Sequence, residues 1–145
     1  MFGGRVAIVT GGGTGIGAAT AGALAARGAD VVIASRTQAN LDEVAASITG
    51  GRCLPVPTDV RDETQVVRLV ERTMEEFGRV DILVNNAGGT RLGPLDTMPT
   101  EAFDNILNLN LRAPFLLTRE AGKHMIGQRT WRRRWCSWPA RPAAT

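Results

Sequence analysis

The chain has 145 residues, 43% of them hydrophobic and 21% charged, a composition that suits one globular domain and excludes a disordered or membrane-spanning chain. The net charge of +3 comes from residues 129–145, because residues 1–128 contain 12 of the 17 basic residues and all 14 acidic ones. Two distant cysteines, Cys53 and Cys136, do not have the spacing of a metal site, and we expect no metal. With no leader segment evident before the first strand, we expect a cytoplasmic protein.

The first half of the chain alternates apolar runs with helical patterns. Residues 5–10 predict a strand, a glycine-rich turn follows, and residues 15–27 predict a helix that ends at Gly28. Residues 31–35 form a continuous apolar run, which is typical of a parallel strand that is covered on both faces. A second amphipathic helix follows and ends at Gly50 and Gly51.

The second half repeats this alternation. Residues 53–56 predict a third strand that leads to Thr58-Asp59-Val60, and Asp62 begins a helix that Gly78 ends. Residues 80–84 predict a fourth strand, and residues 100–127 predict a long helix. The alternation predicts an α/β fold, a truncated doubly wound parallel sheet with strand order 3-2-1-4, in which the glycine turn lies at the switch point.

The turn between the first strand and the first helix reads Thr10-Gly11-Gly12-Gly13-Thr14-Gly15-Ile16-Gly17. Glycines let the backbone reverse sharply and approach a pyrophosphate closely, and the helix that follows directs its positive N-terminal end at the phosphates. The alternative is a flexible glycine loop that binds nothing. A strand before the glycines and a helix after them favour dinucleotide binding.

Residues 129–145 follow neither a helix period nor a strand period, and they contain five arginines and all three tryptophans. We therefore divide the chain into a nucleotide-binding domain at 1–128 and an irregular tail at 129–145, and our first hypothesis is that the tail is translated from a shifted reading frame. Arginines between tryptophans could also bind nucleic acid or an anionic membrane surface, but the tail has no regular face that would support either.

Taken together, these motifs resemble the nucleotide-binding half of the classical short-chain dehydrogenase/reductase family, including its 3-oxoacyl-ACP reductase and glucose dehydrogenase-like members. The resemblance rests on the glycine turn, Asp59-Val60, Asn85-Asn86-Ala87-Gly88 and Asn110 before Leu111, which stand in the family's order and spacing over residues 1–128. It implies an oxidoreductase that transfers a hydride between a nicotinamide cofactor and a ketone or secondary alcohol.

The resemblance also implies roles for individual residues. Asp59 would accept a hydrogen bond from the adenine amino group, with Val60 supplying backbone contacts, and Asn110 would hold a water in the catalytic proton relay. The residues implied around the pyrophosphate and the riboses are Gly11, Thr14, Gly15, Ile16 and Gly17, followed by Asn86, Ala87 and Gly88. The alternative for Asn110 is a polar residue that kinks a packed helix.

The choice of cofactor is predicted from the end of the second strand. A carboxylate there would bind the adenosine ribose hydroxyls of NAD and repel the 2′-phosphate of NADP. This chain has the uncharged Ser35, followed by Arg36, whose guanidinium can pair with a phosphate. We therefore predict NADP(H) rather than NAD(H), the alternative being that Arg36 is a solvated surface charge.

The residues implied for catalysis are incomplete in this chain. The family resemblance implies a tyrosine proton donor, and the chain contains no tyrosine. The only lysine, Lys123, lies near the end of the long predicted helix. We therefore expect a catalytically incomplete oxidoreductase, or alternatively a non-catalytic nucleotide-binding or interaction module. We also expect the helix at 100–127 to expose Phe115 and Leu116, which would promote aggregation or an oligomer.

Overall fold

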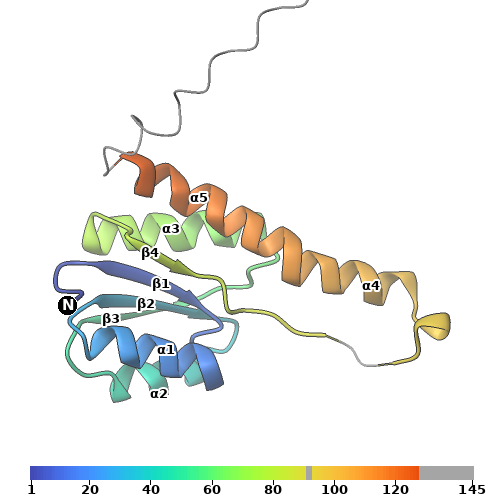
Figure 1. The fold of residues 1–145 in the computed structure, drawn as a ribbon, viewed down its shortest axis with the longest axis horizontal. Helices are drawn as coiled ribbons and strands as arrows, with labels where there is room; N and C mark the ends of the chain where they lie inside the picture. Colours follow the sequence, from blue (N-terminus) through green and yellow to red (C-terminus); the bar gives the residue numbers. More distant parts are fainter. Residues whose placement is uncertain (91–92, 128–145) are drawn as a thin grey trace, which may run out of the picture.

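A computed structural model describes residues 1–90 and 93–127 and shows one parallel sheet with helices on both faces (Figure 1). The sheet has the order β3-β2-β1-β4, and all of its pairings are parallel. Its strands are β1 (Val6–Thr10), β2 (Asp30–Ser35), β3 (Cys53–Pro57) and β4 (Ile82–Val84). The predicted fold class and strand order are therefore confirmed.

Two helices cover each face of the sheet (Figure 1). On one face lie α1 (Gly15–Ala25) and α2 (Gln38–Ser47), and on the other lie α3 (Glu63–Phe77) and α5 (Ala113–Gly127). Alternate residues of β1 divide between the two sides, because Ile8 packs in the cluster with α3 and α5 while Val9 packs with α1 and α2. Burial on both faces explains why the central strands are continuously apolar.

The edge position of β3 agrees with its composition. Pro55 and Pro57 lie within this strand and cannot donate backbone hydrogen bonds, so a central position would leave gaps in the ladder. β3 pairs with β2 alone, with Val32 opposite Leu54 and Ala34 opposite Val56. The sheet therefore accommodates the prolines at its edge.

Helix boundaries differ slightly from those predicted. The first two helices end at Ala25 and Ser47, a few residues before the glycines that were expected to stop them. The third helix behaves as predicted at both ends: Asp62 caps its N-terminus, accepting from the backbone N–H groups of Thr64 and Gln65, and Gly78 ends it in a left-handed conformation.

The long helix predicted at 100–127 lies where expected but is not a regular α-helix throughout. After the short 3-10 turn η1 (Leu95–Thr97), it consists of α4 (Thr100–Leu107), a π-helical turn η2 (Asn108–Arg112) and α5. Within the π turn, the Asn110 side chain donates to the carbonyl oxygen of Ile106 at 2.8 Å. A side chain that competes for a helix carbonyl favours such a local irregularity.

The prediction that Phe115 and Leu116 would both lack cover was wrong for one of them. Leu116 is only 2% exposed, because it packs against β1 and α3 in the main core cluster, whereas Phe115 is 60% exposed. Adjacent helical residues point about 100° apart, so one side chain can reach the sheet while its neighbour faces away.

Among the described residues, no helix combines the length and the apolar character needed to cross a membrane. The tail at 129–145, including its proposed frame shift, lies outside the described residues.

Candidate functional site

A cleft of about 260 Å³ opens at the carboxyl ends of β1 and β2, beside the loops that follow β3 and β4. The cleft borders the switch point of the sheet between β1 and β4, where α/β folds bind ligands because the crossovers on its two sides leave in opposite directions. The residues that line the cleft are Gly11, Thr14, Ala34, Ser35, Arg36, Thr58, Asp59, Val60, Arg61, Ala87, Gly88 and Leu109.

Most of the predicted cofactor-binding residues therefore meet at one place. Eight of them line the cleft: Gly11, Thr14, Ser35, Arg36, Asp59, Val60, Ala87 and Gly88. The others, Gly15, Ile16, Gly17 and Asn86, belong to the turn or brace it, and Asn110 lies behind Gly88 and Gly89. Among the lining residues, Ala34, Thr58, Arg61 and Leu109 were not predicted as site residues.

The glycine turn has open space beside Gly15 and is tightly packed at Gly17. Gly15 has a positive φ of 53°, and a Cβ atom there would meet nothing within 4 Å. A Cβ atom on Gly17 would instead lie 2.2 Å from the carbonyl oxygen of Gly11, so only glycine permits this approach. The open space at the start of α1 fits a diphosphate, because unpaired N–H groups at a helix N-terminus attract anions.

Thr10 and Asn86 connect the turn to the loop after β4. The Thr10 hydroxyl accepts from the backbone N–H groups of Asn86 and Ala87, both at 3.1 Å, and donates to the carbonyl oxygen of Val84 at 3.2 Å. In return, Asn86 Nδ2 donates to the Thr10 carbonyl oxygen at 3.0 Å. Thr10 is fully buried, and its contacts hold the loop that contributes Ala87 to the cleft against the end of β1. The sequence did not predict this role for Thr10.

The end of β2 is held from both sides. Gly12 N–H donates to the Ala34 carbonyl oxygen at 3.1 Å, and Thr58 N–H donates to the Ser35 carbonyl oxygen at 2.8 Å. Arg36 follows at once and lines the cleft as an exposed residue. The backbone at the end of β2 is therefore held by hydrogen bonds from the glycine turn and from the loop after β3.

Asp59 does not face the cleft as a free carboxylate. Arg61 Nε donates to its Oδ1 at 2.9 Å, Arg61 Nη2 donates to its Oδ2 at 2.5 Å, and Arg61 N–H donates to Oδ1 at 3.1 Å. The hydrogen bond from the Arg61 side chain is the main cause that lowers the pKa of Asp59, against a smaller opposing effect of burial, and the charge of Arg36 also contributes. The Asp59 carboxylate is thus held ionised and paired.

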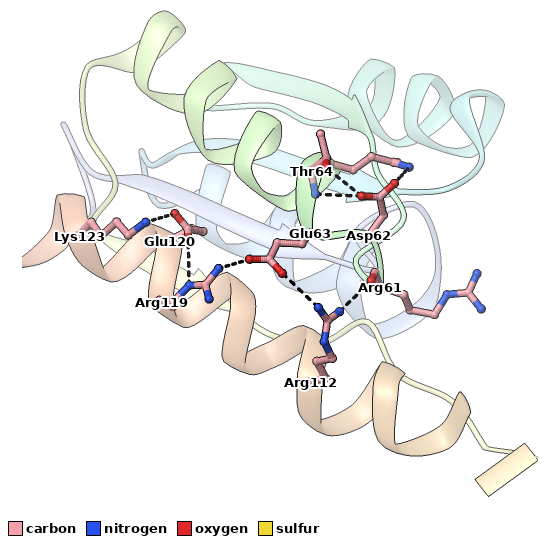
Figure 2. A network of polar contacts seen from close by, with 9 residues as sticks. Arg61, Asp62, Glu63, Thr64, Arg112, Arg119, Glu120 and Lys123 are labelled. Atoms are coloured by element: carbon pink, nitrogen blue, oxygen red, sulfur yellow. Dashed lines mark hydrogen bonds and ion pairs between the residues drawn. The ribbon is translucent and has the colours of Figure 1, made fainter. Parts of the chain in front are cut away.

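A chain of ion pairs fixes the loop that carries Asp59 and Arg61 onto the long helix (Figure 2). Arg112 donates to the Arg61 carbonyl oxygen at 3.2 Å and to Glu63 at 3.1 Å, and Arg119 donates to the other Glu63 oxygen at 2.6 Å. The hydrogen bond from Arg119 is the main cause that lowers the pKa of Glu63.

The chain of ion pairs continues along α5. Arg119 also donates to Glu120 at 2.7 Å, and Lys123 pairs with the other oxygen of Glu120 (Figure 2). Lys123, the only lysine, is therefore engaged in an ion pair on α5.

Asn110 reaches the far side of the cleft, where it binds the loop after β4. Its Nδ2 donates to the Gly89 carbonyl oxygen at 2.7 Å, and its Oδ1 accepts from Gly89 N–H at 3.2 Å. The π turn thus contacts two loops beside the cleft. Asn110 binds Gly89 in the loop after β4, and Arg112 binds Arg61 in the loop after β3. Within residues 1–90 and 93–127, no group of three or more His, Cys, Asp or Glu is placed to hold a metal ion.

Comparison with known proteins agrees with this geometry. The family model described as short chain dehydrogenase matches residues 5–132. The 3-oxoacyl-[acyl-carrier-protein] reductase FabG of Thermotoga maritima is 38% identical over 128 residues, which are 87% of this chain and 52% of that protein. The chain thus spans about half the length of this curated relative.

Solved structures of the same kind superimpose closely. A metagenomic short-chain oxidoreductase in complex with NADP is 37% identical with a TM-score of 0.83, and covers 88% of this chain and 59% of its own. NAD+-bound xylitol dehydrogenase is 32% identical with a TM-score of 0.84, and covers 88% of this chain and 50% of its own. Similar folds therefore hold either nicotinamide cofactor.

Proposed function

Because this chain belongs to the short-chain dehydrogenase family, whose model matches residues 5–132, we propose that its cleft binds NADP(H) in preference to NAD(H). One observation carries the proposal: the end of β2 presents Ser35 and Arg36 to the cleft where a carboxylate would favour NAD. Structures similar to this one contain NADP or NAD+, so selection between them depends on the residues at this position.

The charge of the cleft supports the same cofactor. Its lining includes two guanidinium groups, Arg36 and Arg61, and one carboxylate, Asp59, which Arg61 already pairs. A 2′-phosphate would gain charge-assisted hydrogen bonds from Arg36, whereas a ribose hydroxyl would gain much less. The pyrophosphate would be held by the glycine turn, through Gly11, Thr14, Gly15, Ile16 and Gly17.

Binding tests this proposal directly. Titration of the chain with NADPH and with NADH, followed by nicotinamide fluorescence or calorimetry, should give the tighter dissociation constant for NADPH. Equal binding, or tighter binding of NADH, would contradict the proposal. The adenosine monophosphates with a 2′- or a 5′-phosphate provide a further comparison, because only the first carries the group that Arg36 is proposed to bind.

For activity, we propose an oxidoreductase of ketones or secondary alcohols whose catalytic residues are incomplete in these 145 residues. The bound cofactor supplies or accepts a hydride, and Asn110 would order a water near Gly89 in the proton relay. A phenol to protonate the carbonyl oxygen is not present in the sequence. Oxidation of NADPH above background with a panel of carbonyl substrates would favour the oxidoreductase over the alternative, a non-catalytic nucleotide-binding module that binds NADPH without oxidising it.

We also propose that the long helix mediates self-association. Four of its exposed apolar residues are spaced by four and read the same in both directions, namely Phe103, Leu107, Leu111 and Phe115. A second copy packed antiparallel would place phenylalanine opposite phenylalanine and leucine opposite leucine, as a two-fold interface requires. An open groove of about 480 Å³ lies along this stripe and is lined by Leu107, Leu111 and Phe115, among others.

The remaining proposals concern the tail and the location of the protein. We propose that the domain lies in the cytoplasm. We also propose that residues 129–145 are encoded in a shifted reading frame. Read from the third base of the Trp135 codon, any codons for Trp135-Cys136 give valine; if the frame is shifted, this register also contains a downstream tyrosine codon with a lysine codon four residues later. A gene without these codons would rule the frame shift out.

A further inference from the structure

We propose that Arg61 determines cofactor specificity by neutralising Asp59, so that the cleft tolerates the 2′-phosphate of NADP(H). This inference rests on the proposed binding of NADP(H) and assigns part of the preference to a residue outside β2. Arg36 would attract the phosphate, and Arg61 would remove the charge that opposes it.

The contacts of Arg61 cover both oxygens of the Asp59 carboxylate. Arg61 Nε lies 2.9 Å from Oδ1 and 3.2 Å from Oδ2, and Arg61 Nη2 lies 2.5 Å from Oδ2. Such a bidentate pair is stronger and more directional than a single ion contact. Among the residues that line the cleft, Asp59 is the only acid, so this pair accounts for the negative charge of the lining.

The orientation of the pair is fixed by the backbone around it. Gln65 Oε1 accepts from Asp59 N–H at 2.9 Å, and Asp62, which caps α3, accepts from Gln65 Nε2 at 3.0 Å. On the other side, Arg112 donates to the Arg61 carbonyl oxygen (Figure 2). Both partners are therefore held in place before a ligand arrives, which reduces the entropy cost of keeping the two side chains paired.

The proximity of Arg36 gives the pair its effect on specificity. Asp59 and Arg36 line the same cleft and are close enough for the charge of Arg36 to favour ionisation of Asp59. If Arg61 were absent, the Asp59 carboxylate would compete with the 2′-phosphate for Arg36 and would repel the phosphate. NADH, which has a hydroxyl at that position, would lose much less.

The test compares Arg61→Gln with the double variant Asp59→Asn/Arg61→Gln. We expect the dissociation constant of NADPH to rise roughly tenfold in Arg61→Gln and that of NADH to rise less than about twofold. The double variant should return the ratio of the two constants to within about threefold of the original. Arg72→Gln is the matched control, because Arg72 forms an exposed ion pair with Glu75 on α3 and does not line the cleft.

The outcomes separate the possible explanations. If Arg61→Gln leaves the ratio of the NADPH and NADH dissociation constants unchanged while its thermal melt matches that of Arg72→Gln, Arg61 has no role in specificity. If the ratio falls but the double variant does not restore it, Arg61 contacts the phosphate itself, and neutralisation of Asp59 is wrong. If the unaltered chain does not prefer NADPH, the proposed function fails. A preference for NADPH that is insensitive to Arg61 contradicts this inference alone.

Discussion

Asp81 and Arg5, which are 76 residues apart, form an ion pair of 2.9 Å where β1 and β4 begin. Arg79 adds two hydrogen bonds of 2.7 and 2.8 Å to the same carboxylate, and Val6 N–H adds a third at 2.9 Å. The Asp81 side chain is 4% exposed. Burial alone would raise its pKa, but these donors outweigh burial and lower the pKa to about 2.

The first prediction is an acid-dependent loss of stability. Because the pKa of Asp81 is lower in the folded state than in the unfolded state, its contribution is present above about pH 4 and is lost as the pH falls toward 2. We expect Asp81→Asn to lower the free energy of unfolding by roughly 2 kcal/mol at pH 7 and by much less at pH 2. Urea denaturation across this range measures it, with Asp96→Asn as an exposed control. If Asp81→Asn lowers the free energy of unfolding by the same amount at every pH, the stabilisation does not come from the ionised Asp81 carboxylate.

The second prediction compares two glycines on the same helix. Gly17→Ala would place a methyl group 2.2 Å from the Gly11 carbonyl oxygen, so we expect a loss of roughly 1–3 kcal/mol of stability and weaker binding of NADPH. Gly22→Ala meets no atom within 4 Å and should stabilise α1 by roughly 0.5–1 kcal/mol. Thermal melts of both variants test the contrast, and equal effects would mean that the turn is not tightly packed.

The third prediction concerns the end of β2. Ser35→Asp places a carboxylate beside the proposed 2′-phosphate position, so we expect weaker binding of NADPH and a shift of preference toward NADH. Ser47→Asp, at the exposed C-terminal end of α2, serves as the control. Measured dissociation constants decide the point, and a Ser35→Asp variant that still prefers NADPH as strongly as before would show that this position does not select the cofactor.

The fourth prediction tests how Asn110 holds the loop after β4. Asn110→Asp keeps the shape of the side chain but loses the Nδ2 donor to the Gly89 carbonyl oxygen. Because Asn110 is exposed, we expect the free energy of unfolding to fall by roughly 0.5–1.5 kcal/mol, with faster hydrogen exchange of the Gly89 amide. Asn105→Asp, at an exposed position five residues earlier on the long helix, provides the comparison. Unchanged exchange at Gly89 would show that this contact does not restrain the loop.

The fifth prediction concerns the exposed stripe of the long helix. Leu111 is 66% exposed at the centre of the stripe, so Leu111→Glu should shift the chain toward the monomer by placing a charge in the proposed interface. Leu95→Glu, which alters an exposed leucine of η1, should leave association unchanged. Sedimentation velocity measures both. A chain that is already monomeric at high concentration would contradict the proposed interface.

Local patterns in the sequence predicted the secondary structure well because each pattern reports a nearby constraint. The apolar run at 31–35 became β2, and Asp62 and Gly78 were placed correctly at the two ends of α3. The strand order followed from the alternation of strands and helices, because right-handed crossovers leave few alternatives. The family resemblance predicted six of the twelve residues that line the cleft, and the residue types at the end of the second strand predicted two more, Ser35 and Arg36.

The pairing and burial of individual side chains could not be predicted in this way. No periodicity indicates that Arg61 pairs with Asp59, that Arg112 reaches the Arg61 carbonyl oxygen, or that Leu116 is buried while Phe115 is exposed. These outcomes depend on the angle at which the long helix crosses α3 and on the π turn at 108–112, which rotates the residues that follow it.

The sequence by itself determined the parallel α/β architecture, the open glycine turn and the uncharged end of β2, because these depend on local residue types and on spacing along the chain. The tertiary structure alone decided how the charges of the cleft are paired. Asp59 and Arg61 are two residues apart in the chain, but whether Asp59 is a free acceptor or a neutralised one depends on how the folded backbone orients the two side chains. The energy of such a pair depends on distances of a few ångströms that no linear pattern specifies.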